Sequence, residues 1–138
     1  MKVHEVMSPN VHVISLDTSL VDAAKLMRRE AIGFLPAVED GIVMGVVTDR
    51  DLLLRGIAEG RNPHMTTVRH LMTRALIWCY EDDVLTAAAR IMEDNRIRRL
   101  LVLSRDKRLV GLLSLDDLAA QMSSDRLLAE VLRHVTAA

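Results

Sequence analysis

The stretch Gly45-Val46-Val47-Thr48-Asp49-Arg50-Asp51 recurs later in the chain as Gly111-Leu112-Leu113-Ser114-Leu115-Asp116-Asp117. Each stretch consists of a glycine, two apolar residues, a hydroxyl residue and, three positions after the hydroxyl, an aspartate. The apolar residues are typical of a strand, and the polar residues that follow are typical of a helix start. The same strand-to-helix junction therefore occurs twice, which indicates an internal duplication.

The duplication extends outward from these two junctions. Ala23-Ala24-Lys25-Leu26-Met27 is matched by Ala88-Ala89-Arg90-Ile91-Met92, 65 residues later. The two junction glycines are 66 residues apart, because the turn before the second glycine is one residue longer. Two copies of this length do not form a solenoid. We expect two copies that face each other across a pseudo-two-fold axis, with two equivalent clefts along it.

Composition narrows the class of protein. The chain has 138 residues, of which 50% are hydrophobic, so we expect one compact domain or two half-domains that share a core. The formal net charge of -1 argues against general nucleic-acid binding, which needs a basic face. The single cysteine excludes an internal disulfide framework and fits a reducing compartment. With no apolar run of signal-peptide or membrane-span length, we expect a soluble cytoplasmic protein without membrane association.

The pattern of apolar residues predicts an α/β fold of two β-α-β-β-α units followed by a C-terminal amphipathic helix. The expected strands are residues 11–14, 34–38, 42–47, 76–79, 100–103 and 109–113. The expected helices are residues 3–7, one that follows the N-cap candidates 17–19 and runs to about 29, 51–59, 68–72, 84–94, one that begins at 116, and 125–135. We place the first repeat at 1–62, the second at 63–123 and the C-terminal helix at 124–138. That helix carries an apolar stripe, which indicates either packing within the chain or a dimer contact: Leu127, Leu128, Val131, Leu132 and Val135.

The hydroxyl and aspartate of each junction have two physical interpretations. In the structural one they cap a helix, with the hydroxyl oxygen accepting a hydrogen bond from a free backbone N–H. In the functional one they bind a nucleotide: a helix start favours phosphate, and a carboxylate accepts two hydrogen bonds from ribose hydroxyls. The sequence leaves both interpretations open.

The ordered recurrence of short motifs resembles the CBS domain family, in the tandem arrangement called a Bateman module. The motifs are Met7-Ser8-Pro9, Leu35-Pro36-Ala37-Val38, the first junction and their counterparts in the second copy, and the resemblance covers residues 3 to 122. The first junction is especially similar to stand-alone bacterial proteins with two such repeats, including the hypoxic response protein type. The resemblance implies regulatory binding of AMP, ADP, ATP, S-adenosylmethionine or NAD between the repeats, usually without catalysis.

In such modules each site combines the hydroxyl and aspartate of one repeat with residues of the other. Carried over to this chain, the resemblance implies one site made of Thr48, Asp51, Ala75, Leu76, Ile77, Arg98 and Arg99. It implies a second site made of Asn10, Val11, His12, Gly33, Phe34, Ser114 and Asp117.

The two predicted sites differ in charge. Arg98 and Arg99 fall where relatives place phosphate-binding residues, and arginine suits two-pronged phosphate contact. The corresponding residues of the first copy, Gly33 and Phe34, carry no charge. We therefore hypothesise that the site with Thr48 and Asp51 binds the phosphate, and that the other is empty or takes a ligand of little negative charge. The alternative for the arginines is a solvated helix-to-strand turn.

No residue pattern predicts a metal site or an enzyme. The histidines and Cys79 are scattered, without CxxC, HxxxH or HExxH spacing, although a site assembled across copies stays open. Phosphate-binding loops of the Gly-x-x-x-x-Gly-Lys type and Gly-x-Ser-x-Gly elbows do not occur. The leading hypothesis is a non-catalytic, homodimeric module that needs no cofactor, binds an adenosyl nucleotide and signals to an unknown effector protein. The alternative is a ligand-independent homodimeric interaction scaffold, in which both junctions only cap helices.

Overall fold

The computed structural model describes residues 1–121 and 125–136. It divides into two compact units. We call His12–Leu76 the first-repeat unit, and Met1–Val11 together with Ile77–Ala138 the second-repeat unit. The predicted ranges 1–62, 63–123 and 124–138 follow the sequence repeat, whereas the packing units assign the first eleven residues to the second repeat. The predicted boundary at 123 and 124 lies outside the described residues.

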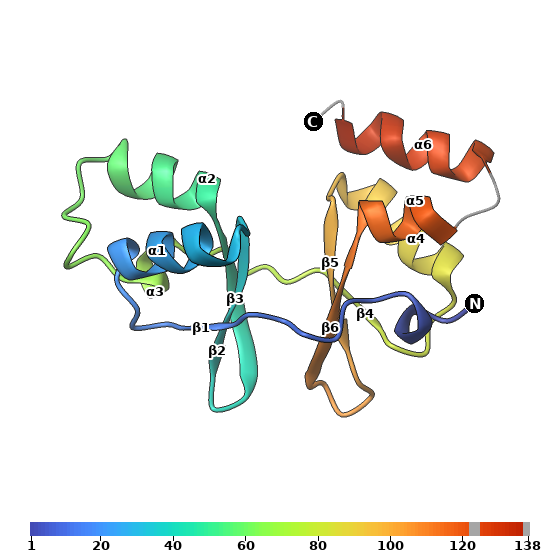
Figure 1. Ribbon diagram of the computed structural model, residues 1–138, viewed down its shortest axis with the longest axis horizontal. Coiled ribbons are helices and arrows are strands. Elements are labelled where there is room, and N and C mark those ends of the chain that lie inside the picture. Colours follow the sequence, from blue (N-terminus) through green and yellow to red (C-terminus); the bar gives the residue numbers. More distant parts are fainter. Residues whose placement is uncertain (122–124, 137–138) are drawn as a thin grey trace. The chain divides into compact units, whose positions relative to one another are not determined.

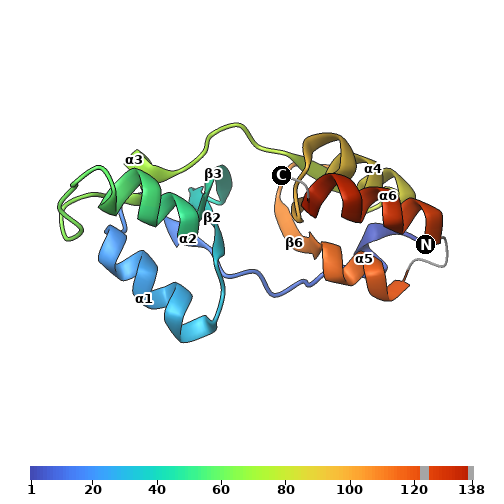
Figure 2. The same ribbon diagram turned by 90° about the horizontal axis from the view of Figure 1, so that it is seen from above.

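The first-repeat unit is a three-stranded sheet with helices on one face (Figures 1 and 2). Its elements in chain order are β1 (Ile14–Ser15), α1 (Leu20–Glu30), β2 (Phe34–Glu39), β3 (Ile42–Thr48), α2 (Asp49–Asp51), the π-helical turn η2 (Leu52–Ile57) and α3 (Val68–Leu71). Strand β2 lies in the middle, parallel to β1 and antiparallel to β3. The apolar side chains of α1 and the sheet form one buried cluster that includes Leu16, Leu35 and Val47.

The second-repeat unit repeats this plan. Its elements are the 3₁₀ turn η1 (Val3–Glu5), β4 (Trp78–Tyr80), α4 (Leu85–Asn95), β5 (Arg99–Leu103), β6 (Leu109–Ser114), α5 (Leu115–Gln121) and α6 (Asp125–Thr136). Strand β5 is central, parallel to β4 and antiparallel to β6. In the described residues of both units, no helix is long and apolar enough to cross a membrane.

The predicted α/β class and the order β-α-β-β-α are confirmed in both units, and the C-terminal helix is present. The first strand of each unit was predicted to begin too early. Only Ile14 and Ser15 pair with β2, and β4 begins at Trp78, so residues 11–13 and 76–77 lie before the strands. An apolar run shows that a segment is buried, but hydrogen bonding to a neighbour decides where a strand begins.

The one-residue difference between the repeats lies in the hairpin turns, as predicted. Asp40 and Gly41 both have positive φ, 51° and 78°, which is the geometry of a tight two-residue turn. In the second hairpin Leu103 pairs with Leu109, and Ser104 N donates to the carbonyl of Arg108 across a longer loop. The extra residue is therefore absorbed in a surface turn, and both hairpins keep equivalent pairing, with a register shift between Ala37 and Val38 in one and between Val102 and Leu103 in the other.

In each unit, the segment that leads to the first strand of the other unit packs on the sheet. Thr73, which precedes β4 in the chain, exchanges two backbone hydrogen bonds with Val46 of β3, at 2.9 and 2.8 Å. Ser8 does the same with Leu112 of β6, at 2.9 and 3.0 Å. A Cβ on Gly45 would lie 2.8 Å from the carbonyl oxygen of Thr73. The repeated glycine is thus required by the close approach of a backbone segment.

The apolar stripe of α6 packs within the chain. Val131 and Val135 belong to the buried cluster of the second-repeat unit, together with Ala89, Met92 and Leu118. Of the two alternatives for this stripe, intramolecular packing is the one that the structure shows for these residues. Leu127 lies among the side chains that the structure does not describe.

Candidate functional site

Both hydroxyl–aspartate pairs form reciprocal caps at a strand-to-helix junction. Asp51 N donates to Thr48 Oγ1 at 3.1 Å, and Thr48 N donates to Asp51 Oδ2 at 2.9 Å. Ser114 and Asp117 make the same two bonds at 3.0 and 2.9 Å. The caps do not exclude a ligand, because a hydroxyl that accepts one bond still has a proton to donate and each carboxylate has a second oxygen. The side chain of Asp51 is 18% exposed, and its Oδ1 lies 4.0 Å from Arg55 Nε.

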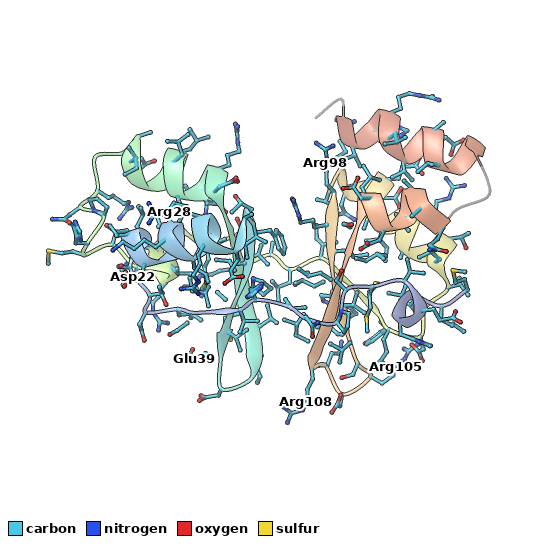
Figure 3. All side chains as sticks on the ribbon, viewed as in Figure 1. Asp22, Arg28, Glu39, Arg98, Arg105 and Arg108 are labelled. Carbon is cyan, nitrogen blue, oxygen red and sulfur yellow. The ribbon has the colours of Figure 1, made fainter. Side chains whose placement is uncertain are left out.

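Two arginines and a hydroxyl line a small polar pocket in the second-repeat unit. The pocket has a volume of about 190 Å³ and is lined by Arg98, Arg99, Ser114, Leu115 and Asp116. Arg99 lies opposite Ser114 in the pairing of β5 with β6, and Leu115 N donates to the carbonyl of Arg98 at 2.8 Å. Figure 3 shows Arg98 at the end of the hairpin where α5 begins, with Arg108 at the turn end.

This pocket has the chemistry of an anion site. Guanidinium groups donate paired hydrogen bonds to phosphate or carboxylate oxygens, and a hydroxyl adds a further donor. Asp116 was not among the predicted site residues, although it lies between Ser114 and Asp117 in the junction motif. Its carboxylate repels anions, so the two arginines set the balance of charge in the pocket.

In the first-repeat unit, Gly33 and Phe34 stand at the positions of the two pocket arginines. Phe34 lies opposite Thr48 in the pairing of β2 with β3, and Asp49 N donates to the carbonyl of Gly33 at 3.0 Å. A Cβ on Gly33 would lie 2.6 Å from Asp49 Oδ2, so a side chain there requires Asp49 to move. At this position the two copies therefore differ in packing as well as in charge.

The remaining predicted residues lie where the chain passes from one unit to the other. Asn10 and Val11 end the first segment of the second-repeat unit, and His12 begins the first-repeat unit, where its Nε2 lies 3.6 Å from Glu30 Oε2. Ala75 and Leu76 end the first-repeat unit, and Ile77 follows in the second. Within one unit the structure brings together Thr48 and Asp51 with Gly33 and Phe34, and Arg98 and Arg99 with Ser114 and Asp117. The crosswise grouping of each site stays a prediction.

The side chains described by the structure, those of residues 1–121 and 128–135, form no cluster suited to a metal ion. No group of three or more His, Cys, Asp or Glu side chains among them has the geometry of a metal site. Cys79 is a free thiol in the core, 1% exposed. Burial, and secondarily the carboxylate of Asp83, raises the pKa of its thiol to about 12.

The raised pKa of Cys79 predicts how stability depends on alkaline pH. The folded state favours the neutral thiol, whereas the unfolded thiol ionises near its usual pKa of 9.0. The neutral thiol of Cys79 therefore contributes fully to the free energy of unfolding below pH 9, and this contribution is lost as the pH rises toward 12. We expect the free energy of unfolding to fall by up to about 1.4 kcal/mol per pH unit in this range. Urea unfolding of the wild type and Cys79→Ala between pH 8 and 10.5 measures this; equal slopes for both proteins would contradict it.

Comparison with known proteins agrees with this architecture. The family model described as "CBS domain" matches residues 3–56 and 68–124. The CBS domain-containing protein YhcV of Bacillus subtilis is 32% identical over 97% of this chain and 94% of its own length. Hypoxic response protein 1 of Mycobacterium tuberculosis is 29% identical over 86% of this chain and 82% of its own length.

Solved structures share the fold. CBSX2, crystallised in complex with AMP, superposes with a TM-score of 0.74 and 30% identity, covering 86% of this chain and 93% of that one. The CBS domain pair of MJ0100, in complex with 5-methylthioadenosine and S-adenosyl-L-methionine, gives a TM-score of 0.76 at 25% identity, covering 87% and 98%.

Proposed function

The chain belongs to the CBS domain family and carries two copies of the domain, and on this premise we propose that it is a regulatory module that binds an adenosyl nucleotide. The observation that carries the proposal is the pocket lined by Arg98, Arg99 and Ser114. Asp117, whose carboxylate accepts a hydrogen bond from Ser114 N, lies three residues after Ser114. Related CBS domain pairs have been crystallised with AMP and with S-adenosyl-L-methionine, which supports ligands of the same class here.

The proposed roles follow from the chemistry of each group. Arg98 and Arg99 bind the phosphate, a junction hydroxyl donates to it, and a junction carboxylate accepts from the ribose hydroxyls. The resemblance pairs the arginines with Thr48 and Asp51, whereas the pocket supports Ser114 as their neighbour. In both arrangements the arginines supply the positive charge, so they are the first residues to test.

Replacing either arginine is expected to weaken AMP binding about tenfold, because each removes a charge-assisted contact with the phosphate. Isothermal titration of AMP into the wild type, Arg98→Ala and Arg99→Ala measures the loss. Arg108→Ala is the matched control, since Arg108 lies at the far end of the same hairpin and is exposed (Figure 3). Equal affinity in Arg98→Ala, Arg99→Ala and Arg108→Ala would contradict the assignment.

The proposal includes the finer predictions from the sequence. The module acts without catalysis and without a required cofactor, as a cytoplasmic homodimer, and AMP, ADP, ATP or S-adenosylmethionine is its regulatory ligand. Ligand binding shifts a pre-existing conformational equilibrium by as much as its affinity differs between the two states. Its output is a contact with an effector protein.

A further inference from the structure

The junction of the first repeat contains a positive charge that the second repeat lacks. Arg55 lies four residues after Asp51, on the π-helical turn η2. Counted from the repeated glycines, its counterpart in the second repeat is Gln121, which carries no charge. The hydroxyl–aspartate caps of the two repeats make the same hydrogen bonds. Capping alone therefore does not account for the difference in charge.

Arg55 joins two parts of the first-repeat unit. Its Nη1 donates to the carbonyl of Leu71 at 3.2 Å and to the carbonyl of Met72 at 3.1 Å. Its Nε lies 4.0 Å from Asp51 Oδ1. The guanidinium group is planar and rigid, so hydrogen bonds at one of its nitrogens fix the direction of the whole group. The backbone at Leu71 and Met72 thus holds a positive charge beside the carboxylate of Asp51.

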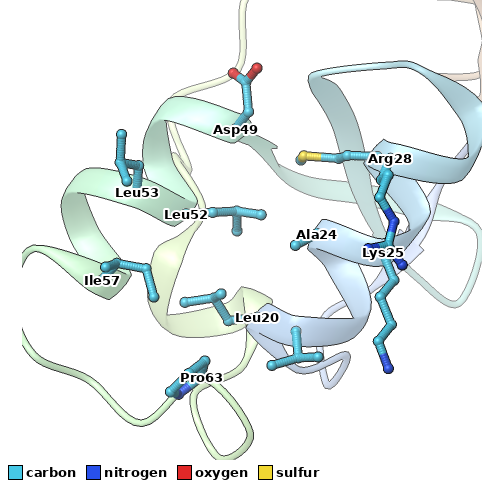
Figure 4. A pocket seen from close by; sticks show the side chains of 11 residues that line it. Leu20, Ala24, Lys25, Arg28, Asp49, Leu52, Leu53, Ile57 and Pro63 are labelled. Atoms are coloured by element: carbon cyan, nitrogen blue, oxygen red, sulfur yellow. The ribbon is translucent and has the colours of Figure 1, made fainter.

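The packing of η2 fixes where the side chain of Arg55 begins. Leu52 and Ile57 of this turn line an apolar pocket beside α1 (Figure 4). A Cβ on Gly56 would overlap the side chain of Leu20, so the turn lies close against α1. A π-helical turn often occurs at functional sites. Held in this way by α1, the turn directs Arg55 to the end of α3.

The carbonyl groups that bind Arg55 belong to a well-packed backbone segment. Leu71 is fully buried and Met72 is 5% exposed. The next residue, Thr73, exchanges two backbone hydrogen bonds with Val46 of β3. Because these carbonyls are fixed, the guanidinium group of Arg55 is fixed as well, although 51% of its side chain is exposed.

The two carboxylate oxygens of Asp51 have different surroundings. Oδ2 accepts a hydrogen bond from Thr48 N at 2.9 Å, whereas Oδ1 lies beside Arg55. A separation of 4.0 Å is too long for a direct hydrogen bond, so the guanidinium group attracts Oδ1 without occupying its lone pairs. Oδ1 is therefore held in one direction and is still able to accept a hydrogen bond from a ligand hydroxyl.

We propose that Arg55 is a positioning residue that holds Asp51 for the ribose of an adenosyl nucleotide. The inference rests on the proposed nucleotide function and adds a residue to it. Arg55 orients Asp51 Oδ1 toward a ribose hydroxyl, and the hydrogen bonds to Leu71 and Met72 keep Arg55 in place. In the second repeat Gln121 supplies no such charge, so ribose recognition by a junction aspartate is stronger in the first repeat.

Isothermal titration of AMP, 2′-deoxy-AMP and 3′-deoxy-AMP into the wild type, Arg55→Gln and Arg55→Lys tests the proposal. The wild type should bind AMP about tenfold more tightly than at least one deoxy analogue, because only AMP offers both hydroxyls to a charged acceptor. Arg55→Gln should lower this ratio to about twofold, since the acceptor is no longer held in place. Arg55→Lys keeps the charge and should retain part of the ratio. A merely structural role of Arg55 would weaken all three ligands equally and leave the ratio unchanged.

Arg61→Gln is the matched control, because it removes the same charge from an exposed residue shortly after η2. It should keep the wild-type ratio. The proposal is wrong if Arg55→Gln keeps that ratio, or if Arg55→Gln and Arg61→Gln lower it equally. It is also wrong if the wild type binds AMP and both deoxy analogues with equal affinity, a result that leaves nucleotide binding itself intact. If the wild type binds none of the three, AMP binding fails and this proposal with it, so the wild-type titration alone separates the two failures.

Discussion

Gly45→Ala is expected to lower the free energy of unfolding by about 3 kcal/mol, the upper range for an overpacked buried site. The added Cβ would lie 2.8 Å from the carbonyl oxygen of Thr73 and 2.8 Å from Met72 Sδ. The methionine can rearrange. The carbonyl cannot move without breaking its 2.9 Å hydrogen bond from Val46 N. Urea denaturation of the purified variant measures the loss.

Met44→Ala is the control for Gly45→Ala. Met44 is the neighbouring residue on β3 and is 37% exposed, so its truncation should cost less than about 1 kcal/mol. If Gly45→Ala is as stable as Met44→Ala, the segment at Thr73 does not pack on β3 as described. The result also tests why the junction motif contains a glycine, because a large loss of stability would mean that folding requires it.

Val131→Asp is expected to cost about 3–5 kcal/mol or to release α6 from the second-repeat unit. Val131 is fully buried, and a carboxylate in its place has no partner within the apolar cluster of α4 and α5. Leu132→Asp makes the same chemical change one residue later, at a side chain that is 38% exposed, and should cost far less. Urea unfolding and resistance of the C-terminus to proteolysis report the two effects.

Equal behaviour of Val131→Asp and Leu132→Asp would contradict the packing of α6. Arg90→Ala, which removes the ion pair with Glu130, should weaken the same interface much less than Val131→Asp, since this arginine is exposed.

The elements of the fold were predictable because their signals are local. Apolar periodicity located α1 and α4, the Asp40-Gly41 pair marked the first hairpin, and the recurring junction revealed the duplication. The start of the first strand was harder to predict. The apolar residues Val11 and Val13 read as strand, but strand formation depends on a partner far away in the sequence, and only Ile14 and Ser15 have one.

Contacts between segments that lie far apart in the chain could not be predicted from the sequence. The docking of Ser8 on Leu112 and of Thr73 on Val46 joins residues that share no periodic pattern, so the role of the two junction glycines stayed hidden. The candidate site was predictable in its residue types. The neighbourhood of Arg99 and Ser114 follows from the register of β5 with β6, which an isolated strand pattern does not specify.

Because Asp51 and Asp117 each cap a helix, the choice of substitution matters when their role in ligand binding is tested. Alanine at Asp51 or Asp117 removes a cap worth roughly 1 kcal/mol together with any ligand contact, so stability and binding change at once. Asparagine retains an oxygen that accepts the backbone hydrogen bond and removes the charge. Asp51→Asn and Asp117→Asn therefore separate the capping role of each carboxylate from a role in ligand binding.

Thermal unfolding with and without AMP, ADP, ATP, S-adenosylmethionine and NAD, in the wild type, Asp51→Asn and Asp117→Asn, tests the central claim most directly. A ligand at about 100 times its Kd should stabilise the wild type by about 2.7 kcal/mol. We predict such a shift for at least one adenosyl ligand, with loss of the shift in one Asp→Asn variant whose own melting temperature is nearly unchanged. Cooperative unfolding of the wild type at the same temperature with every one of these ligands would contradict the claim and favour the ligand-independent scaffold.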